Sequence, residues 1–420
     1  MKTTFFLFFL VSITYAQQVD SIHNPSHFIS GEYLVGYSVP VADTSQKIYT
    51  GKGMFVNFGA FQDNNPSEWA YRLKYPKTGI SLGVIDFQNV HNMGYAFTAM
   101  PFIEYSPFKR DRFKIHAGLG AAFINGSNTP PFDKEVDVIT TNFNWSFKLF
   151  LKYNLIQYNA LHWDFGAGYF HYSNGHTKLP NRGLNALMLS TSIAYEYTKR
   201  KPLHNTNESE IPNYQRSTYY TLESNMGLGF QVLSDQFNTK KSVFSISMLG
   251  SKVYNNTFKV GIGAFYRFYD HFHDYIANNE QLIRESYSDF REAPFRYSTN
   301  FGIYIQGEVL LNHIGIVADA GYNIHKPFYE IERLLSQTFS TIQETPNGPE
   351  KVYIYGGKFN GDYRLKKAIT SRLGIRYYVK STKNKTPYNY FIGVNIKANA
   401  GQADFSELNI GMTYSIMGSK

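Results

Sequence analysis

Apolar and polar side chains alternate along most of this chain, and that pattern constrains the fold more than any other feature. In residues 143–153 the odd positions are apolar or aromatic, whereas the even positions include Asn144, Ser146 and Lys148. Successive side chains of a strand point to opposite faces, so the pattern predicts a strand with one apolar and one polar face. The same alternation occurs in residues 113–123, 258–268, 388–398 and 408–416.

The composition indicates that these strands span a membrane. Aromatic residues and charged residues each make up 17% of the 420 residues, whereas globular proteins carry about 25% charged residues. After the N-terminus, no apolar run reaches the roughly 18 residues that a membrane helix needs. The chain has no cysteine, which excludes disulfides, cysteine nucleophiles and thiolate metal sites. These features predict an all-β fold, an antiparallel transmembrane β-barrel of the outer membrane with its apolar face toward lipid.

The first sixteen residues have the pattern of a targeting segment. Lys2 precedes an apolar run over residues 5–13, and residues 14–16 form a small-residue cleavage site before Gln17. This pattern predicts a secretory signal peptide over residues 1–16, because its apolar core is too short to span a bilayer. A buried N-terminal strand is the alternative. Export together with a barrel composition predicts a Gram-negative outer membrane.

Sixteen strands are predicted, an even number as bacterial barrels require. If the chain enters from the periplasm, the outer connections include 125–141, 174–184, 269–298 and 324–367, three of which are long, as is usual for this class. A short helix is predicted over residues 328–338. We predict one barrel, and the alternative is two eight-stranded units that divide at the polar segment 198–216. The predicted strands are 28–38, 52–61, 78–87, 93–105, 112–124, 142–154, 162–173, 185–197, 217–232, 241–250, 256–268, 299–311, 313–323, 368–379, 388–400 and 405–416.

Three polar residues interrupt the apolar face of the hairpin formed by the seventh and eighth strands. His171 and Ser173 are two residues apart, so both project from that face near its outer end. In a simple antiparallel register Asn185 lies opposite Ser173. A serine becomes a nucleophile beside a base, and a third group fixes the tautomer of the imidazole. The pattern predicts a catalytic set of His171, Ser173 and Asn185, and the alternative is a polar and aromatic girdle at the membrane interface.

The loop of the same hairpin offers further hydrogen-bond donors and two basic residues. Asn174, Gly175 and Asn181 carry backbone or amide donors that can stabilise an oxyanion or position a substrate. Lys178 and Arg182 are basic residues of the same loop and are candidate contacts for phosphate groups.

Residues 171–185 resemble the active-site hairpin of the PagL-type lipid A 3-O-deacylases, also called the acyloxyacyl hydrolase-like family. Residues 68–76, 79–83 and 117–120 are similar to Bacteroidetes members of that family, and residues 397–411 resemble its extended versions. The resemblance implies a serine esterase on an outer-membrane barrel that removes an ester-linked acyl chain from lipid A at the outer leaflet.

By this resemblance His171 is the general base and Ser173 the nucleophile, and the family's acidic third member falls on Asn185. The best-known pattern has Glu there. An amide can orient an imidazole but supplies no negative charge. The chain is thus expected to comprise a deacylase-like portion (17–200) and further barrel strands with long outer loops at 270–298 and 324–367 (201–420).

Other features predict less. The segment 270–274 carries two Asp and two His residues around Phe272, and such side chains can bind a divalent metal, but we interpret the segment as loop polarity and expect neither a metal nor a cofactor. The net charge of +9 is not gathered in one basic stripe, so lipid A, lipopolysaccharide and outer-membrane lipids are the expected partners, not nucleic acid. A non-catalytic barrel with a structural or transport role and a secreted soluble β protein are the alternative functions. The oligomeric state, the acyl position cut and the choice between lipid A and a related lipid stay open.

Overall fold

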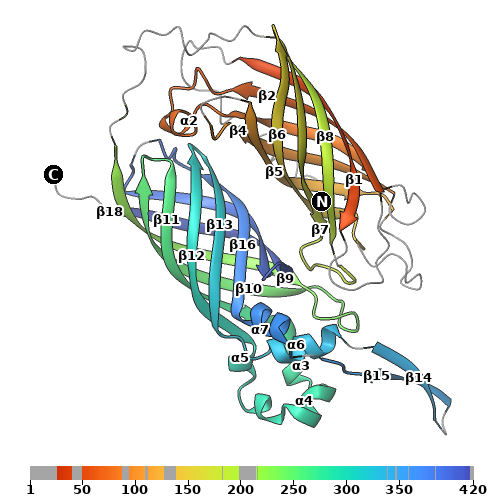
Figure 1. Cartoon of the computed structure of the whole chain (residues 1–420). Coiled ribbons are helices and arrows are strands. Elements are labelled where there is room, and N and C mark those ends of the chain that lie inside the picture. The colour runs from red at the N-terminus through yellow and green to blue at the C-terminus, as the bar shows by residue number, and fades with distance from the viewer. Residues whose placement is uncertain are drawn as a thin grey trace, which may run out of the picture.

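The computed structural model of the chain contains two closed antiparallel barrels of eight strands each (Figure 1). The structure describes residues 26–39, 50–87, 94–108, 112–126, 139–181, 183–197, 214, 216–337, 339–345, 348–357, 359–383 and 385–416. The predicted signal peptide and the predicted phosphate contact Arg182 lie outside these residues.

The first barrel closes by pairing of its first and last strands, with Glu32 opposite Ser192. Its strands follow one another around the barrel in chain order. They are β1 (His27–Val39), β2 (Thr50–Phe61), β3 (Lys77–Asp86), β4 (Tyr95–Tyr105), β5 (Phe113–Ile124), β6 (Phe143–Tyr158), β7 (Leu161–Ser173) and β8 (Leu184–Glu196).

The second barrel closes in the same way, with Ile410 of the last strand opposite Met226 of the first. Its strands are β9 (Thr218–Gln231), β10 (Lys241–Tyr254), β11 (Phe258–Tyr269), β12 (Thr299–Leu311), β13 (Ile314–His325), β16 (Ile369–Tyr378), β17 (Tyr388–Asn399) and β18 (Gln402–Ile416).

The predicted class, an all-β antiparallel barrel, is confirmed, and each of the sixteen predicted strands is present. The structure has the alternative arrangement, two eight-stranded units, instead of the single barrel. The physical reason for two barrels is the size of the interior that each number of strands encloses. Eight strands enclose a space that side chains can fill, whereas sixteen strands leave an aqueous channel.

Ion pairs fill much of the interior of the first barrel. Glu32 lies 2.5 Å from the Lys148 ammonium and 3.0 Å from that of Lys152, and all three side chains are buried. Lys114 and Asp164 form a second buried pair at 2.9 Å. Because buried charges need partners, the inward polar face of these strands consists of matched acids and bases.

The second barrel has an equivalent network at its centre. Arg376 lies 2.9 Å from Glu223 and 3.2 Å from Glu308, and Lys259 lies 3.2 Å from the same Glu308. The Arg376 side chain is fully buried. Within the described residues, the interiors of both barrels are therefore occupied by side chains.

The outer walls are apolar. Met54 and Leu151 on the first barrel, and Ile262 and Ile410 on the second, are each at least 60% exposed. Such a surface is stable next to lipid chains and unfavourable in water. Among the described residues, no helix has the length and apolar character needed to cross a membrane.

Helices cover one end of the second barrel (Figure 1). Their apolar side chains form one buried cluster that includes Phe272, Ile283, Phe328 and Ile331. The helix predicted over 328–338 is confirmed as α6. The helices are α3 (Asp270–Ala277), α4 (Gln281–Ser286), the 3₁₀ turn η3 (Ser288–Glu292), α5 (Pro294–Tyr297), α6 (Tyr329–Ser336) and α7 (Gly361–Ala368). A hairpin of β14 (Phe339–Thr345) and β15 (Gly348–Ile354) lies between α6 and α7 in the chain and projects away from the helices (Figure 1).

The barrels contact each other at the end opposite the helices. The short helix α2 (Glu68–Arg72) lies there, between β2 and β3. The Asn256 amide of the β10–β11 turn donates to Glu68 at 2.9 Å, and the Asn312 amide of the β12–β13 turn donates to the Ser67 hydroxyl at 3.1 Å. Turns of the second barrel thus hold this end of the first barrel.

Candidate active site

The hairpin of β7 and β8 places the predicted catalytic residues on the outer wall of the first barrel. Even-numbered residues of β7 such as Phe170 and Tyr172 point inward and are buried, so His171 and Ser173 point outward. The predicted register differs by two residues, because Asn185 pairs with His171, not with Ser173. The last pair of the β7–β8 ladder is Tyr172 with Leu184, and Ser173 lies beyond it, where it still pairs with Trp145 of β6. A shift of two keeps every side chain on its face.

This register brings the imidazole and the amide into direct contact. The His171 Nδ1 atom lies 2.7 Å from Oδ1 of Asn185. A carbonyl oxygen only accepts hydrogen bonds, so Nδ1–H is the donor and Nε2 carries the free lone pair. The Tyr169 hydroxyl donates to the same Asn185 oxygen. Two donors therefore hold this amide, and the amide fixes the imidazole in the tautomer that a general base requires.

The Ser173 hydroxyl receives two hydrogen bonds from the hairpin loop. The Gly175 backbone N–H and the Asn181 side-chain amide each donate to Oγ, both at 3.2 Å. Since both acceptor sites of the hydroxyl are used, its hydrogen is free to point elsewhere. No hydrogen bond joins Ser173 to His171 in the structure of this hairpin, as is common before a substrate binds. Ser173 is only 3% exposed, so it is more enclosed than its place on the apolar face predicts.

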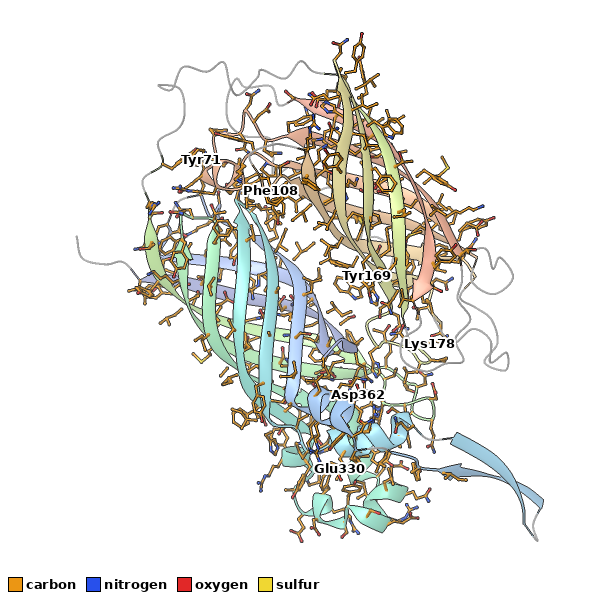
Figure 2. The ribbon with its side chains drawn as sticks, viewed as in Figure 1. Tyr71, Phe108, Tyr169, Lys178, Glu330 and Asp362 are labelled. Atoms are coloured by element: carbon orange, nitrogen blue, oxygen red, sulfur yellow. The ribbon has the colours of Figure 1, made fainter. Side chains whose placement is uncertain are left out.

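Asn174 shapes the loop instead of facing the serine hydroxyl. Its side chain donates to the Lys178 carbonyl at 2.8 Å and accepts from the Thr177 N–H at 3.2 Å. Its backbone N–H lies 3.4 Å from Oδ1 of Asn181, which turns the amide nitrogen of Asn181 toward Ser173. The Lys178 side chain is exposed beyond the end of β7 (Figure 2).

Three further residues belong to this site, although the pattern of catalytic residue types did not single them out. Tyr169 precedes His171 by two positions on the same face, and Trp145 of β6 lies beside Ser173. Gly183 has φ +68°, and a Cβ atom there would lie 3.0 Å from Cε1 of His171. The one signal in the sequence was spacing, because Tyr169 shares the i, i+2 face of His171.

The segment 270–274, considered as a metal site, has other contacts. It forms the first part of α3, where the His271 ring contacts the Thr239 carbonyl and Asp274 pairs with Lys241. No group of three or more potential metal ligands occurs among the residues that the structure describes.

The fold and this site together define an outer-membrane β-barrel protein whose outer wall carries a histidine, a serine and an asparagine in one polar cluster. Residues 32–194 match the family model described as lipid A 3-O-deacylase (PagL). That match spans nearly all of the first barrel, β1 to β8, so the first barrel is similar to the PagL family.

Other comparisons add less. No curated protein matches the chain. Among solved structures, an outer membrane channel from Pseudomonas putida F1 is 10% identical, with 95% of this chain and 100% of that chain covered and a TM-score of 0.19. A BenF-like porin from Pseudomonas fluorescens Pf-5 is 8% identical, with 94% and 98% covered and a TM-score of 0.21. These scores are too low to establish a shared arrangement of strands.

Proposed function

We propose that the first barrel is a serine esterase that hydrolyses an ester-linked acyl chain of lipid A at the outer leaflet of the outer membrane. The observation that carries the proposal is the 2.7 Å contact of His171 Nδ1 with Asn185 Oδ1, next to a serine on the lipid-facing wall. The match of residues 32–194 to the family model described as lipid A 3-O-deacylase supports the substrate class.

In the proposed reaction, Nε2 of His171 takes the hydroxyl proton of Ser173 as Oγ attacks the ester carbonyl carbon. The Gly175 N–H and the Asn181 amide, which already face Oγ, stabilise the oxyanion that forms beside it. Collapse of this intermediate breaks the bond to the alcohol oxygen of the sugar, which receives the proton from His171. Water, deprotonated by the same nitrogen, then releases the fatty acid from Ser173.

The surroundings fit an amphipathic substrate. The aromatic side chains of Trp145, Phe147 and Tyr169 lie around the polar cluster on the outer wall, where they can contact an acyl chain. The exposed Lys178 lies at the end of the hairpin and is the proposed phosphate contact. The acyl chain would thus bind on the lipid side of Ser173, and the phosphate would bind on its aqueous side.

Release of fatty acid by the purified chain tests this proposal. Lipid A and a phospholipid are each presented in mixed micelles, and released fatty acid is measured by mass spectrometry. We expect release from lipid A. Release from the phospholipid alone would show that the substrate class is wrong, and release from neither would contradict the esterase.

Transport is the second candidate function, and the interiors argue against it. The networks around Glu32 and Arg376 fill the middle of each barrel within the described residues. A solute would have to separate buried ion pairs, which costs several kcal/mol for each charge left unpaired. A transport barrel also has no use for the polar cluster on its outer wall.

Substitution of Asn185 tests the role of its amide oxygen. Asn185→Leu is expected to lower kcat by about 10²-fold with KM nearly unchanged, because the imidazole loses its orienting acceptor. Asn185→Asp keeps an oxygen in the same place and adds negative charge beside the imidazolium, so kcat should be preserved or increased. Steady-state kinetics on lipid A measure both. A Leu variant as active as the wild type would remove Asn185 from the mechanism.

Substitution of Gly183 tests how closely the loop must approach the base. Gly183→Ala places a methyl group 3.0 Å from Cε1 of His171 at a backbone φ of +68°, so the ring must move. A displacement of about 1 Å can lower a rate by about 10²-fold, and we expect kcat to fall by roughly 10-fold to 10²-fold. The control is Gly31→Ala in β1, where nothing lies within 4 Å of the added atom. Equal rates for the two variants would contradict the expected contact.

A further inference from the structure

The hairpin loop that carries both donors to Ser173 is held by the second barrel. Figure 2 shows Tyr169 on the side of the first barrel that faces the second barrel. The loop, residues 174–183, begins directly after Ser173. It contacts the β9–β10 connection and the outer end of β18.

Asn238 of the β9–β10 connection binds the loop with both ends of its amide. Its Nδ2 donates to the Leu179 carbonyl at 2.6 Å, and its Oδ1 accepts from the Leu179 N–H at 2.9 Å. The side chain thus satisfies both backbone groups of one residue, as a neighbouring strand would. Leu179 is two residues before Asn181, so this contact fixes the backbone next to one of the donors.

Ser406 of β18 holds the other donor. Its hydroxyl accepts from the Trp145 indole N–H at 2.9 Å and lies 3.4 Å from the Gly175 carbonyl. Gly175 has φ +63°, and a Cβ atom there would lie 2.1 Å from the Ser406 hydroxyl. Ser406 occupies the outward face that continues with the exposed Leu408 and Ile410. A hydroxyl on that apolar face is explained by these two contacts.

A third contact lies between these two. The Val232 N–H at the end of β9 donates to the His176 carbonyl at 3.1 Å. His176 is buried there, and burial lowers the pKa of its imidazole, while the nearby Asp404 of β18 opposes that change. The segment from Gly175 to Leu179 therefore runs along the second barrel.

We propose that the second barrel is a positioning element of the active site, in which Asn238 and Ser406 hold the hairpin loop so that the Gly175 N–H and the Asn181 amide face Ser173. This inference rests on the proposed function. Loops hold catalytic groups less accurately than strands do, so a site with its donors on a loop needs such support. Asn238 and Ser406 act through the loop and do not touch the substrate.

The test uses the full chain with Asn238→Ala, Ser406→Ala and the conservative variant Ser406→Thr. Fatty acid release from lipid A in mixed micelles is measured per folded protein, with the folded fraction taken from heat-modifiable migration on a gel. We expect kcat to fall by roughly 10-fold or more in each Ala variant, with KM within about 2-fold, because misplaced donors act on the transition state. Ser406→Thr retains the hydroxyl and should retain most of the rate.

The matched control is Ser67→Ala, which removes a serine hydroxyl from the contact between the barrels at their other end. Its kcat should equal that of the wild type. If Asn238→Ala and Ser406→Ala are as active as this control, or more active than the wild type, the second barrel does not position the donors and the proposal is overturned.

Amide hydrogen exchange tests whether the second barrel holds the loop, and this test does not depend on whether the chain is an esterase. The Leu179 amide should exchange faster in Asn238→Ala than in the wild type or in Ser67→Ala, because its acceptor is removed. Unchanged exchange would overturn the inference. If the wild-type chain releases no fatty acid, the proposed function fails, and exchange alone decides whether the second barrel orders the loop.

Discussion

Ser173→Ala is expected to lower fatty acid release from lipid A by at least about 10³-fold, because the covalent path is lost with its nucleophile. The barrel should still fold and insert into the membrane. The hydroxyl accepts two hydrogen bonds, from Gly175 and Asn181, and leaving a buried donor without its acceptor costs about 1–3 kcal/mol, a loss confined to one loop. Kinetics on purified protein, with heat-modifiable migration as the folding check, measure both effects.

Ser190→Ala is the matched control for this substitution. Ser190 lies on the neighbouring strand β8, is buried, and points into the barrel, away from the outer wall. The same hydroxyl deletion should leave the rate unchanged. A Ser173→Ala variant that keeps the wild-type rate would show that another residue is the nucleophile.

His171→Ala is expected to be nearly as damaging as Ser173→Ala, since the hydroxyl then has no base. Members of one catalytic unit are strongly non-additive, so the double variant should be no more than about 3-fold slower than either single variant. In the wild type, the acid limb of kcat/KM against pH should report protonation of an essential imidazole. That limb should be absent from the residual activity of His171→Ala.

A double variant far slower than both single variants would contradict a shared mechanism. An unchanged acid limb in His171→Ala would assign the titration to another group. His162, also on β7, points inward and lies 2.7 Å from Glu196, so it is placed to be structural, and His162→Gln is the matched control.

The strands could be predicted because alternation is a local property, whereas closure of the sheet is not. Nothing in the pattern of β8 distinguishes pairing with β1 from pairing with β9. The inward face of the strands carries a sequence signal for small, filled barrels. Its residues include Phe55, Phe150, Phe170 and Tyr172, which are large, apolar or aromatic, and buried. Such side chains suit a filled lumen and would face water in a wide channel.

The sequence predicts which residues form the candidate site, but not the strand register and the contacts that arrange them. The i, i+2 spacing was enough to place His171 and Ser173 on one face. The register was off by two, because the loop ends at Gly183 and the last pair of the ladder is Tyr172 with Leu184. The contacts of Asn238 and Ser406 are absent from any local pattern, since 59 residues separate Asn238 from Leu179 and 231 separate Ser406 from Gly175.

We propose that Ser173 removes an acyl chain from lipid A in the outer membrane, and the mass spectrum of lipid A from whole cells tests this reaction. Lipid A is extracted from Gram-negative cells that produce the wild-type chain, the Ser173→Ala variant or no such protein. We expect a species lighter by one acyl chain only in cells that produce the wild-type chain. Identical spectra from wild-type and Ser173→Ala cells, at equal amounts of folded protein in the outer membrane, would contradict it.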